Sequence, residues 1–132
     1  MSVPLFCIAL LGLLVILLGF RVSLARASSN TVYGGEIDPV SPLYKAQRAH
    51  GNTVEYAPIL AIMMLALAQA PQPGWVLWSM ILATFFRYLF AAGILFPATM
   101  AKPNPMRFIG ALGTYLTGIS LAVALVIQAV NT

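Results

Sequence analysis

Charged side chains are scarce in this sequence. Lys and Arg together number 7 and Asp and Glu together number 3, so charged residues make up 8% of the 132 residues, while hydrophobic residues make up 61%. A soluble globular domain has about 25% charged residues, and a chain this short has a large surface relative to its volume. The shortage excludes a soluble domain. It predicts an integral membrane protein with a single domain over residues 1–132.

Cysteine and histidine are nearly absent as well. Cys7 is the only cysteine and His50 the only histidine, so the sequence excludes a disulfide-bonded secreted scaffold and a four-ligand zinc site, and we expect no metal. The net charge of +4 comes from scattered residues. A nucleic-acid-binding module needs its basic residues on one face, so we expect no nucleic acid partner.

Long segments of the chain carry no charge at all. They are residues 1–20, 56–86, 88–101 and 108–132. A hydrocarbon core about 30 Å thick requires about 20 mainly apolar residues per helix, and a Pro/Gly cluster at 71–74 divides the longest segment. The sequence therefore predicts an all-α fold, an integral membrane four-helix bundle. Its expected spans are 3–24, 46–70, 75–95 and 107–130.

The first span has an alternative interpretation as a secretory signal, because residues 25–27 resemble a cleavage site. A signal peptide carries a positive charge before an apolar run of about 7–15 residues. Here no charge precedes Arg21, and the apolar run is longer. We therefore expect the first helix to be retained.

The distribution of Lys and Arg predicts the topology. An even number of spans places both termini and the turn at 71–74 on one side of the membrane, and none of these carries Lys or Arg. Six of the seven basic residues lie in or near the loops 25–45 and 96–106. Because basic residues favour the cytoplasmic side, we expect a multi-pass protein with charged loops in the cytoplasm and both termini outside.

Polar residues form a stripe at the start of the second span. At about 100° per residue, Arg48, Asn52 and Glu55 fall within a sector about 60° wide on one helix face. Glu55 lies about 13 Å from the start of the helix, where a lone carboxylate is expensive. Arg48 alone is equally explained by extension of its side chain to the lipid headgroups.

Arg87 supplies a charge of opposite sign at the same depth. It lies eight residues before the end of the third span, about 12 Å from the cytoplasmic face. Because an intramembrane charge needs a partner, the sequence predicts that Arg87 pairs with Glu55. The alternative is a pair that only holds two helices together.

Arg107 and Tyr115 extend this polar layer to the fourth span. Arg107 opens the span, and Tyr115 lies eight residues further on, about 12 Å deeper. A cluster of cationic and hydrogen-bonding side chains around one acid would suit an anionic ligand that enters from the cytoplasm. For Tyr115, an ordinary buried aromatic remains the alternative.

The residues of the second span carry a resemblance to a known family. Arg48, Asn52, Glu55 and Pro58 stand at offsets similar to the second-helix signature of the MAPEG superfamily, the membrane-associated proteins in eicosanoid and glutathione metabolism. The chain length, the four spans, the arginine inside the third span and Arg107 at the start of the fourth agree with that family. The chain is most similar to the small bacterial members, which implies a bacterial inner membrane.

The resemblance implies a homotrimer that binds glutathione between subunits, near the cytoplasmic face, as a co-substrate. It implies a transferase or peroxidase acting on lipophilic electrophiles, with Arg107 as the catalytic residue that stabilises the thiolate. A guanidinium within hydrogen-bonding reach of a thiol favours the thiolate. The residues that would bind glutathione by position are Arg48, Asn52, Glu55, Tyr56, Arg87 and Tyr115.

The sequence departs from the family at two positions. Glutathione-using members often have hydroxyl-bearing residues one and two turns after the third-helix arginine, where this chain has Phe90 and Ile94. Two function classes therefore stay open. One is the glutathione-dependent enzyme, and the other is a non-catalytic lipid-binding or scaffold protein of the same fold. Formation of a bound thiolate distinguishes them.

Overall fold

The computed structural model describes residues 2–131, which form four α-helices and contain no strand. The helices, in chain order, are α1 (Val3–Ser29), α2 (Pro42–Leu67), α3 (Gly74–Leu95) and α4 (Pro105–Val130). The predicted all-α fold with four helices is confirmed over these residues.

Local capping residues set where the helices begin. The Ser41 hydroxyl accepts a hydrogen bond from the Tyr44 N–H at 3.3 Å, and Pro42 follows it at the first position of α2. Asn104 caps α4 in the same way, because its Oδ1 accepts from the Arg107 N–H at 3.1 Å. A polar cap followed by proline is a strong signal for a helix start. Both helices therefore begin before the expected membrane spans.

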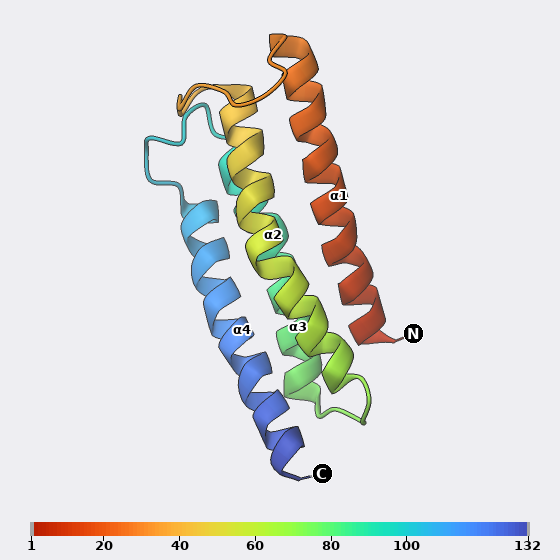
Figure 1. Cartoon of the computed structure of the whole chain (residues 1–132). Helices are drawn as coiled ribbons and strands as arrows, with labels where there is room; N and C mark the ends of the chain where they lie inside the picture. Colours follow the sequence, from red (N-terminus) through yellow and green to blue (C-terminus); the bar gives the residue numbers. More distant parts are fainter. Residues whose placement is uncertain (1, 132) are drawn as a thin grey trace.

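The helices run alternately up and down, so the connections fall at two opposite ends (Figure 1). The long connections 30–41 and 96–104 lie together at one end. The short turn 68–73 lies at the other end, with the start of α1 and the end of α4. This is the two-ended arrangement that the predicted topology requires.

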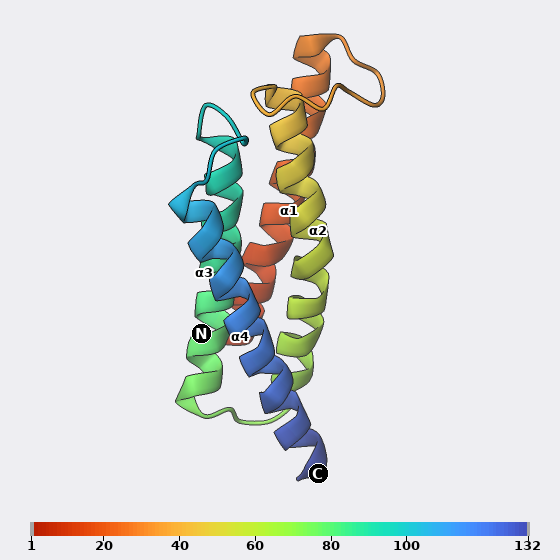
Figure 2. The ribbon, with the colours of Figure 1, turned by 90° about the vertical axis from the view of Figure 1, so that its left-hand side faces the viewer.

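Two pairs of helices make the most extensive contacts, α3 with α4 and α1 with α2. In the described part of the chain, no Cα atom of α1 lies within 8 Å of a Cα atom of α4. Figure 2 shows α4 running obliquely, from beside α3 at its start towards the far end of α2. There Gln128 Nε2 donates to the Ala66 carbonyl at 3.2 Å, and Gln128 Oε1 accepts from Gln72 Nε2 at 2.7 Å.

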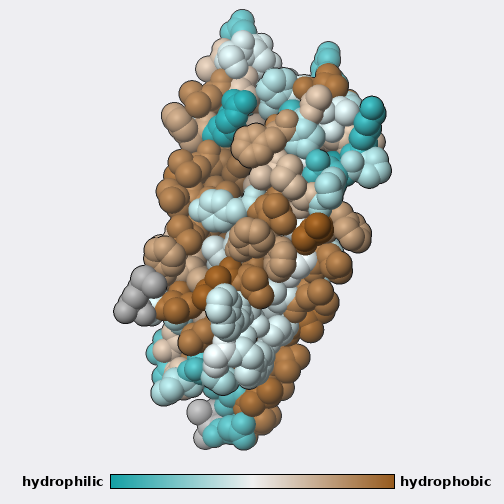
Figure 3. Space-filling model, turned by 180° about the vertical axis from the view of Figure 1, so that it is seen from behind, coloured by the Kyte–Doolittle hydropathy of each residue, from teal (hydrophilic) through white to brown (hydrophobic). Residues whose placement is uncertain are grey.

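Apolar side chains occupy both the interior and most of the outside. The largest buried ones include Leu11, Leu60, Met64, Met80 and Leu121. Apolar side chains also cover the middle of the surface seen in Figure 3, while hydrophilic ones gather at the ends. A soluble bundle would carry polar residues along its outer faces, so this surface fits a lipid environment.

Three of the helices, α1, α3 and α4, are long and apolar enough to cross a membrane. The polar stripe of Arg48, Asn52 and Glu55 in its first half makes α2 the exception among the four. The chain is therefore an integral membrane protein by its helices. The polar half of α2 lies next to the end that carries the long loops (Figure 1).

Glycines allow the backbones of α3 and α4 to touch near that end. A Cβ at Gly93 would lie 2.8 Å from Arg107 Cα, and a Cβ at Gly110 would lie 2.8 Å from Phe90 Cα. Because the hydrophobic effect does not drive helices together in lipid, small residues that permit close packing take its place. These two contacts fix the start of α4 against the last turns of α3.

We therefore expect Gly110→Ala to destabilise the protein. The added methyl group would meet backbone, which cannot rotate away, and overpacking of this kind costs about 1–3 kcal/mol. Gly12→Ala is the matched control, because nothing lies within 4 Å of a Cβ at that helical position, and alanine should be slightly favourable there. Thermal unfolding in detergent, followed by circular dichroism, checks the pair. Equal melting temperatures would contradict the close α3–α4 contact.

Candidate functional site

Thr53 and Tyr56 adjoin the polar stripe of α2 on its inner side, and we include them in the stripe from here on. Thr53 is completely buried, whereas Arg48 and Glu55 are exposed on the opposite side of the helix. Asn52 and Tyr56 lie between these two faces and are half-buried. The stripe therefore has an inner edge that contacts α3 and an outer edge that faces away from this chain.

Arg87 on α3 meets the inner edge of that stripe. Its side chain is only 1% exposed. Its Nη2 donates to Asn52 Oδ1 at 2.7 Å and lies 3.5 Å from Thr53 Oγ1. Two aromatic rings flank the guanidinium, with Cζ 5.1 Å from the Tyr56 ring centroid and 4.9 Å from the Phe90 ring centroid. Cation–π contacts of this geometry stabilise a desolvated charge.

The predicted pair between Arg87 and Glu55 is wrong. Among residues 2–131, Arg87 bonds to the neutral side chains of Asn52 and Thr53, and its Nε has no hydrogen-bond partner. The physical reason is the position of Glu55 around the α2 axis. Glu55 is on the exposed side of the helix, about 60° from Asn52 and about 160° from Thr53 at 100° per residue, so Asn52 and Thr53 meet the guanidinium and the carboxylate does not.

Tyr115 on α4 joins the inner group from the other side. The Tyr56 hydroxyl donates to the Tyr115 hydroxyl at 3.3 Å, and the two ring centroids are 5.9 Å apart. Tyr115 is 51% exposed, so it is not the buried aromatic that the sequence offered as the alternative. The structure thus brings together four of the predicted site residues. We call Asn52, Tyr56, Arg87 and Tyr115 the Arg87 cluster.

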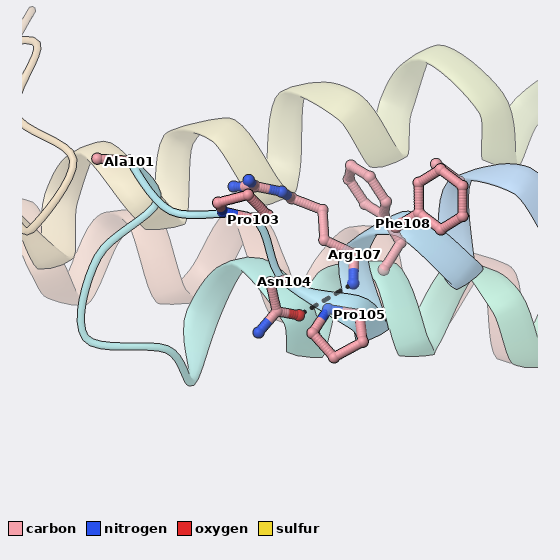
Figure 4. A pocket seen from close by; sticks show the side chains of 8 residues that line it. Ala101, Pro103, Asn104, Pro105, Arg107 and Phe108 are labelled. Carbon is pink, nitrogen blue, oxygen red and sulfur yellow. Dashed lines mark hydrogen bonds between the residues drawn. The ribbon is translucent and has the colours of Figure 1, made fainter.

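Arg107 lies apart from the Arg87 cluster, at the start of α4. Its Nη1 donates to the Met100 carbonyl at 3.0 Å and its Nη2 donates to the Lys102 carbonyl at 3.0 Å. Figure 4 shows the side chain reaching back along the loop over Pro103. Two of the five guanidinium N–H donors are thereby used, and the others remain for a ligand.

Arg107 lines a pocket of about 730 Å³ between the loop, α3 and α4. The other lining residues are mostly apolar: Phe90, Ala101, Pro103, Asn104, Pro105, Phe108 and Ala111. Pockets that bind small molecules have this composition, with a few polar groups on apolar walls. Phe90 belongs to both parts of the site, because its ring packs on Arg87 and also lines this pocket.

Of the residues that line this pocket, only Arg107 was predicted as a site residue. Asn104 fixes the first turn of α4 and so the position of Arg107, and the Asn-Pro sequence at 104–105 is a signal that would have located it. Phe108 forms part of the wall (Figure 4). An exposed phenylalanine in a membrane helix carries no such signal.

The arrangement suits an amphipathic anion. Arg107 presents a fixed positive charge beside apolar walls, and a guanidinium binds carboxylate, thiolate or phosphate through oriented N–H groups. The outer edge of α2 presents Arg48 and Glu55 without hydrogen-bond partners in the described chain. These two charges are available to a ligand or to another subunit.

Comparison with known proteins gives one match. A family model described as the MAPEG family matches residues 4–127. No curated protein and no solved structure gives a significant match. The family match covers nearly all of the four helices and includes both parts of the site.

We expect Asn52→Ala to destabilise the protein, because it removes the oxygen that accepts the 2.7 Å bond from buried Arg87. A hydrogen bond to a charged group contributes about 1.5–3 kcal/mol. Glu55→Gln is the control, and it should change stability by no more than about 0.5 kcal/mol because Glu55 is exposed. Thermal unfolding in detergent compares them. A larger fall in melting temperature for Glu55→Gln than for Asn52→Ala would indicate that Glu55 does pair with Arg87.

Proposed function

The chain belongs to the MAPEG family, and we propose that it is a membrane-embedded, glutathione-dependent transferase or peroxidase that acts on lipophilic electrophiles. The observation that carries this proposal is the fixed guanidinium of Arg107 on the wall of a mainly apolar pocket. The positive charge would stabilise a thiolate, and the apolar walls would bind a lipophilic electrophile that enters from the bilayer.

The outer edge of α2 supports glutathione as the thiol. Glutathione carries one ammonium group and two carboxylates. The exposed Glu55 could bind the ammonium group, and the exposed Arg48 could bind a carboxylate. Asn52 Oδ1 is engaged by Arg87, so its amide nitrogen remains to donate to the ligand. In this proposal Tyr56 and Tyr115 border the ligand, and Arg87 supports them from inside the bundle.

We propose that the protein assembles as a homotrimer with glutathione between neighbouring subunits. Charged side chains are costly next to lipid, and Arg48 and Glu55 point away from the rest of their own chain. A neighbouring subunit that brings its own Arg107 pocket to this edge would surround the ligand with both halves of the site. The trimer itself is a property that the family implies.

The proposed chemistry has two steps. A thiol with a pKa of about 8.5 is mostly protonated at neutral pH, and the positive charge of Arg107 favours loss of its proton to solvent. The thiolate sulfur then donates an electron pair to the electrophilic carbon, a C–S bond forms, and the leaving group departs with its bonding pair. Arg107 thus acts where the negative charge is located, which accelerates the reaction more than uniform binding would.

A lipid-binding scaffold is the second candidate function. Phe90 favours it, because this ring stacks on Arg87 and lines the pocket where many glutathione-using relatives have a hydroxyl group. A fatty acid could place its carboxylate on Arg107 and its chain along the apolar wall. Such a protein would bind a lipophilic anion without ionising a thiol.

We propose that the protein lies in a bacterial inner membrane with both termini outside and the loops 30–41 and 96–104 in the cytoplasm. The clustering of Lys and Arg near those loops supports this orientation. An alkaline phosphatase fused to the C-terminus should therefore be active in cells. If the phosphatase fusion is inactive and a green-type reporter protein fused to the same end fluoresces, the C-terminus lies in the cytoplasm and the proposed orientation is wrong.

Arg107→Ala tests the proposed chemistry. The purified wild-type protein with saturating glutathione should show ultraviolet thiolate absorbance at neutral pH, because the guanidinium stabilises the anion. Arg107→Ala should abolish that absorbance and lower turnover by about 100-fold or more, the effect typical of losing one stabilising donor. Binding should be largely retained, because the α2 residues remain.

Arg21→Ala serves as the control, since Arg21 is an exposed arginine on the same half of the molecule with no contact to the pocket. It should leave the absorbance unchanged. Thiolate absorbance that survives in Arg107→Ala would remove Arg107 from the mechanism. No thiolate in the wild-type protein would favour the scaffold function.

A further inference from the structure

The loop that holds Arg107 is itself held by a lysine on another helix. Lys45, in the first turn of α2, donates from Nζ to the Pro97 carbonyl at 2.7 Å. Lys45 is half-buried. Charge-assisted hydrogen bonds of this length are among the stronger ones in proteins. This bond ties the loop after α3 to the start of α2.

The same loop carries both carbonyl groups that fix the Arg107 guanidinium, those of Met100 and Lys102. Met100 is also tied on its other side, because its N–H donates to the Pro39 carbonyl at 2.9 Å. Met100 therefore connects the two long loops to the guanidinium. The backbone of Arg107 is fixed separately, by the contact with Gly93 and the cap from Asn104.

We propose that Lys45 is a positioning residue for Arg107, which acts by holding the loop 96–104 against the start of α2. This inference rests on the proposed function, since it assigns Lys45 to the same reaction. The contacts between α3 and α4 fix the Cα of Arg107, and the carbonyls of the loop fix its guanidinium. Lys45 holds that loop through Pro97, in addition to the bond between Met100 and Pro39.

Loss of the lysine should therefore affect chemistry more than binding. Without the bond to Pro97, the Met100 N–H still donates to the Pro39 carbonyl, but the loop loses its bond to α2. The carbonyls of Met100 and Lys102 then have more freedom to move, and the guanidinium can move with them. A displacement of about 1 Å at a catalytic group can reduce a rate by about 100-fold. The α2 residues that would hold the peptide part of glutathione do not depend on this loop.

Lys45→Met tests the proposal, because methionine keeps an unbranched side chain and removes the donor. We expect kcat with a chlorodinitrobenzene electrophile to fall about tenfold or more while KM for glutathione changes less than about twofold. The midpoint pH of bound-thiolate absorbance should rise. Lys45→Arg should restore both values, since arginine can also donate to the Pro97 carbonyl. Arg21→Met, which removes an exposed charge from the same half of the molecule, should match wild type.

A wild-type midpoint in Lys45→Met, or a Lys45→Arg variant as impaired as Lys45→Met, would overturn the proposal. Hydrogen–deuterium exchange without glutathione gives a second readout that does not depend on catalysis. Lys45→Met should accelerate exchange in the segment 96–108, and unchanged exchange there would also overturn the proposal. If wild type forms no thiolate at saturating glutathione, the proposed function fails. Faster hydrogen–deuterium exchange in Lys45→Met would then still support the conclusion that Lys45 orders the loop 96–104.

Discussion

The positive charge of Arg87, buried among apolar helices, constrains the rest of the site. A buried guanidinium requires hydrogen-bond acceptors and polarisable neighbours, and α2 supplies them through Asn52, Thr53 and Tyr56. To do so, α2 must turn that face inward. Arg48 and Glu55 are then forced to face outward, away from their own bundle. One interaction inside the subunit thus determines which charges are offered outside it.

The site consequently has two halves, because neither Arg48 nor Glu55 lines the Arg107 pocket. The outer edge of α2 offers a pair of opposite charges, and the pocket at the start of α4 offers Arg107 with apolar walls. A peptide-like thiol matches the first half, and a lipophilic reaction partner matches the second. Both halves lie towards the end of the bundle that carries the long loops (Figure 1). In the proposed trimer, the outer edge of α2 from one subunit and the Arg107 pocket of its neighbour would form one site.

The four helices could be predicted from the long apolar segments and from the Pro/Gly cluster at 71–74, which divides the longest uncharged run into parts of two helices. The partner of Arg87 was not predicted, because a residue's position along a helix says nothing of its rotation about the helix axis. The missing clue was the series Ala46, Ala49, Thr53 and Ala57, whose small size marks the buried face of α2. The loop 96–104 was beyond prediction, since its path depends on contacts with Lys45 and Pro39, which are distant in sequence.

We propose that the outward charges of α2 bind glutathione, and isothermal titration of the purified, detergent-solubilised protein tests this binding directly. We expect saturable heat with glutathione, competition by an S-alkyl glutathione, and strongly weakened binding in the double variant Arg48→Ala/Glu55→Gln. That variant should stay folded because both side chains are exposed. Absence of heat in the wild-type protein, or equal affinity in the double variant, would show that these charges do not bind glutathione.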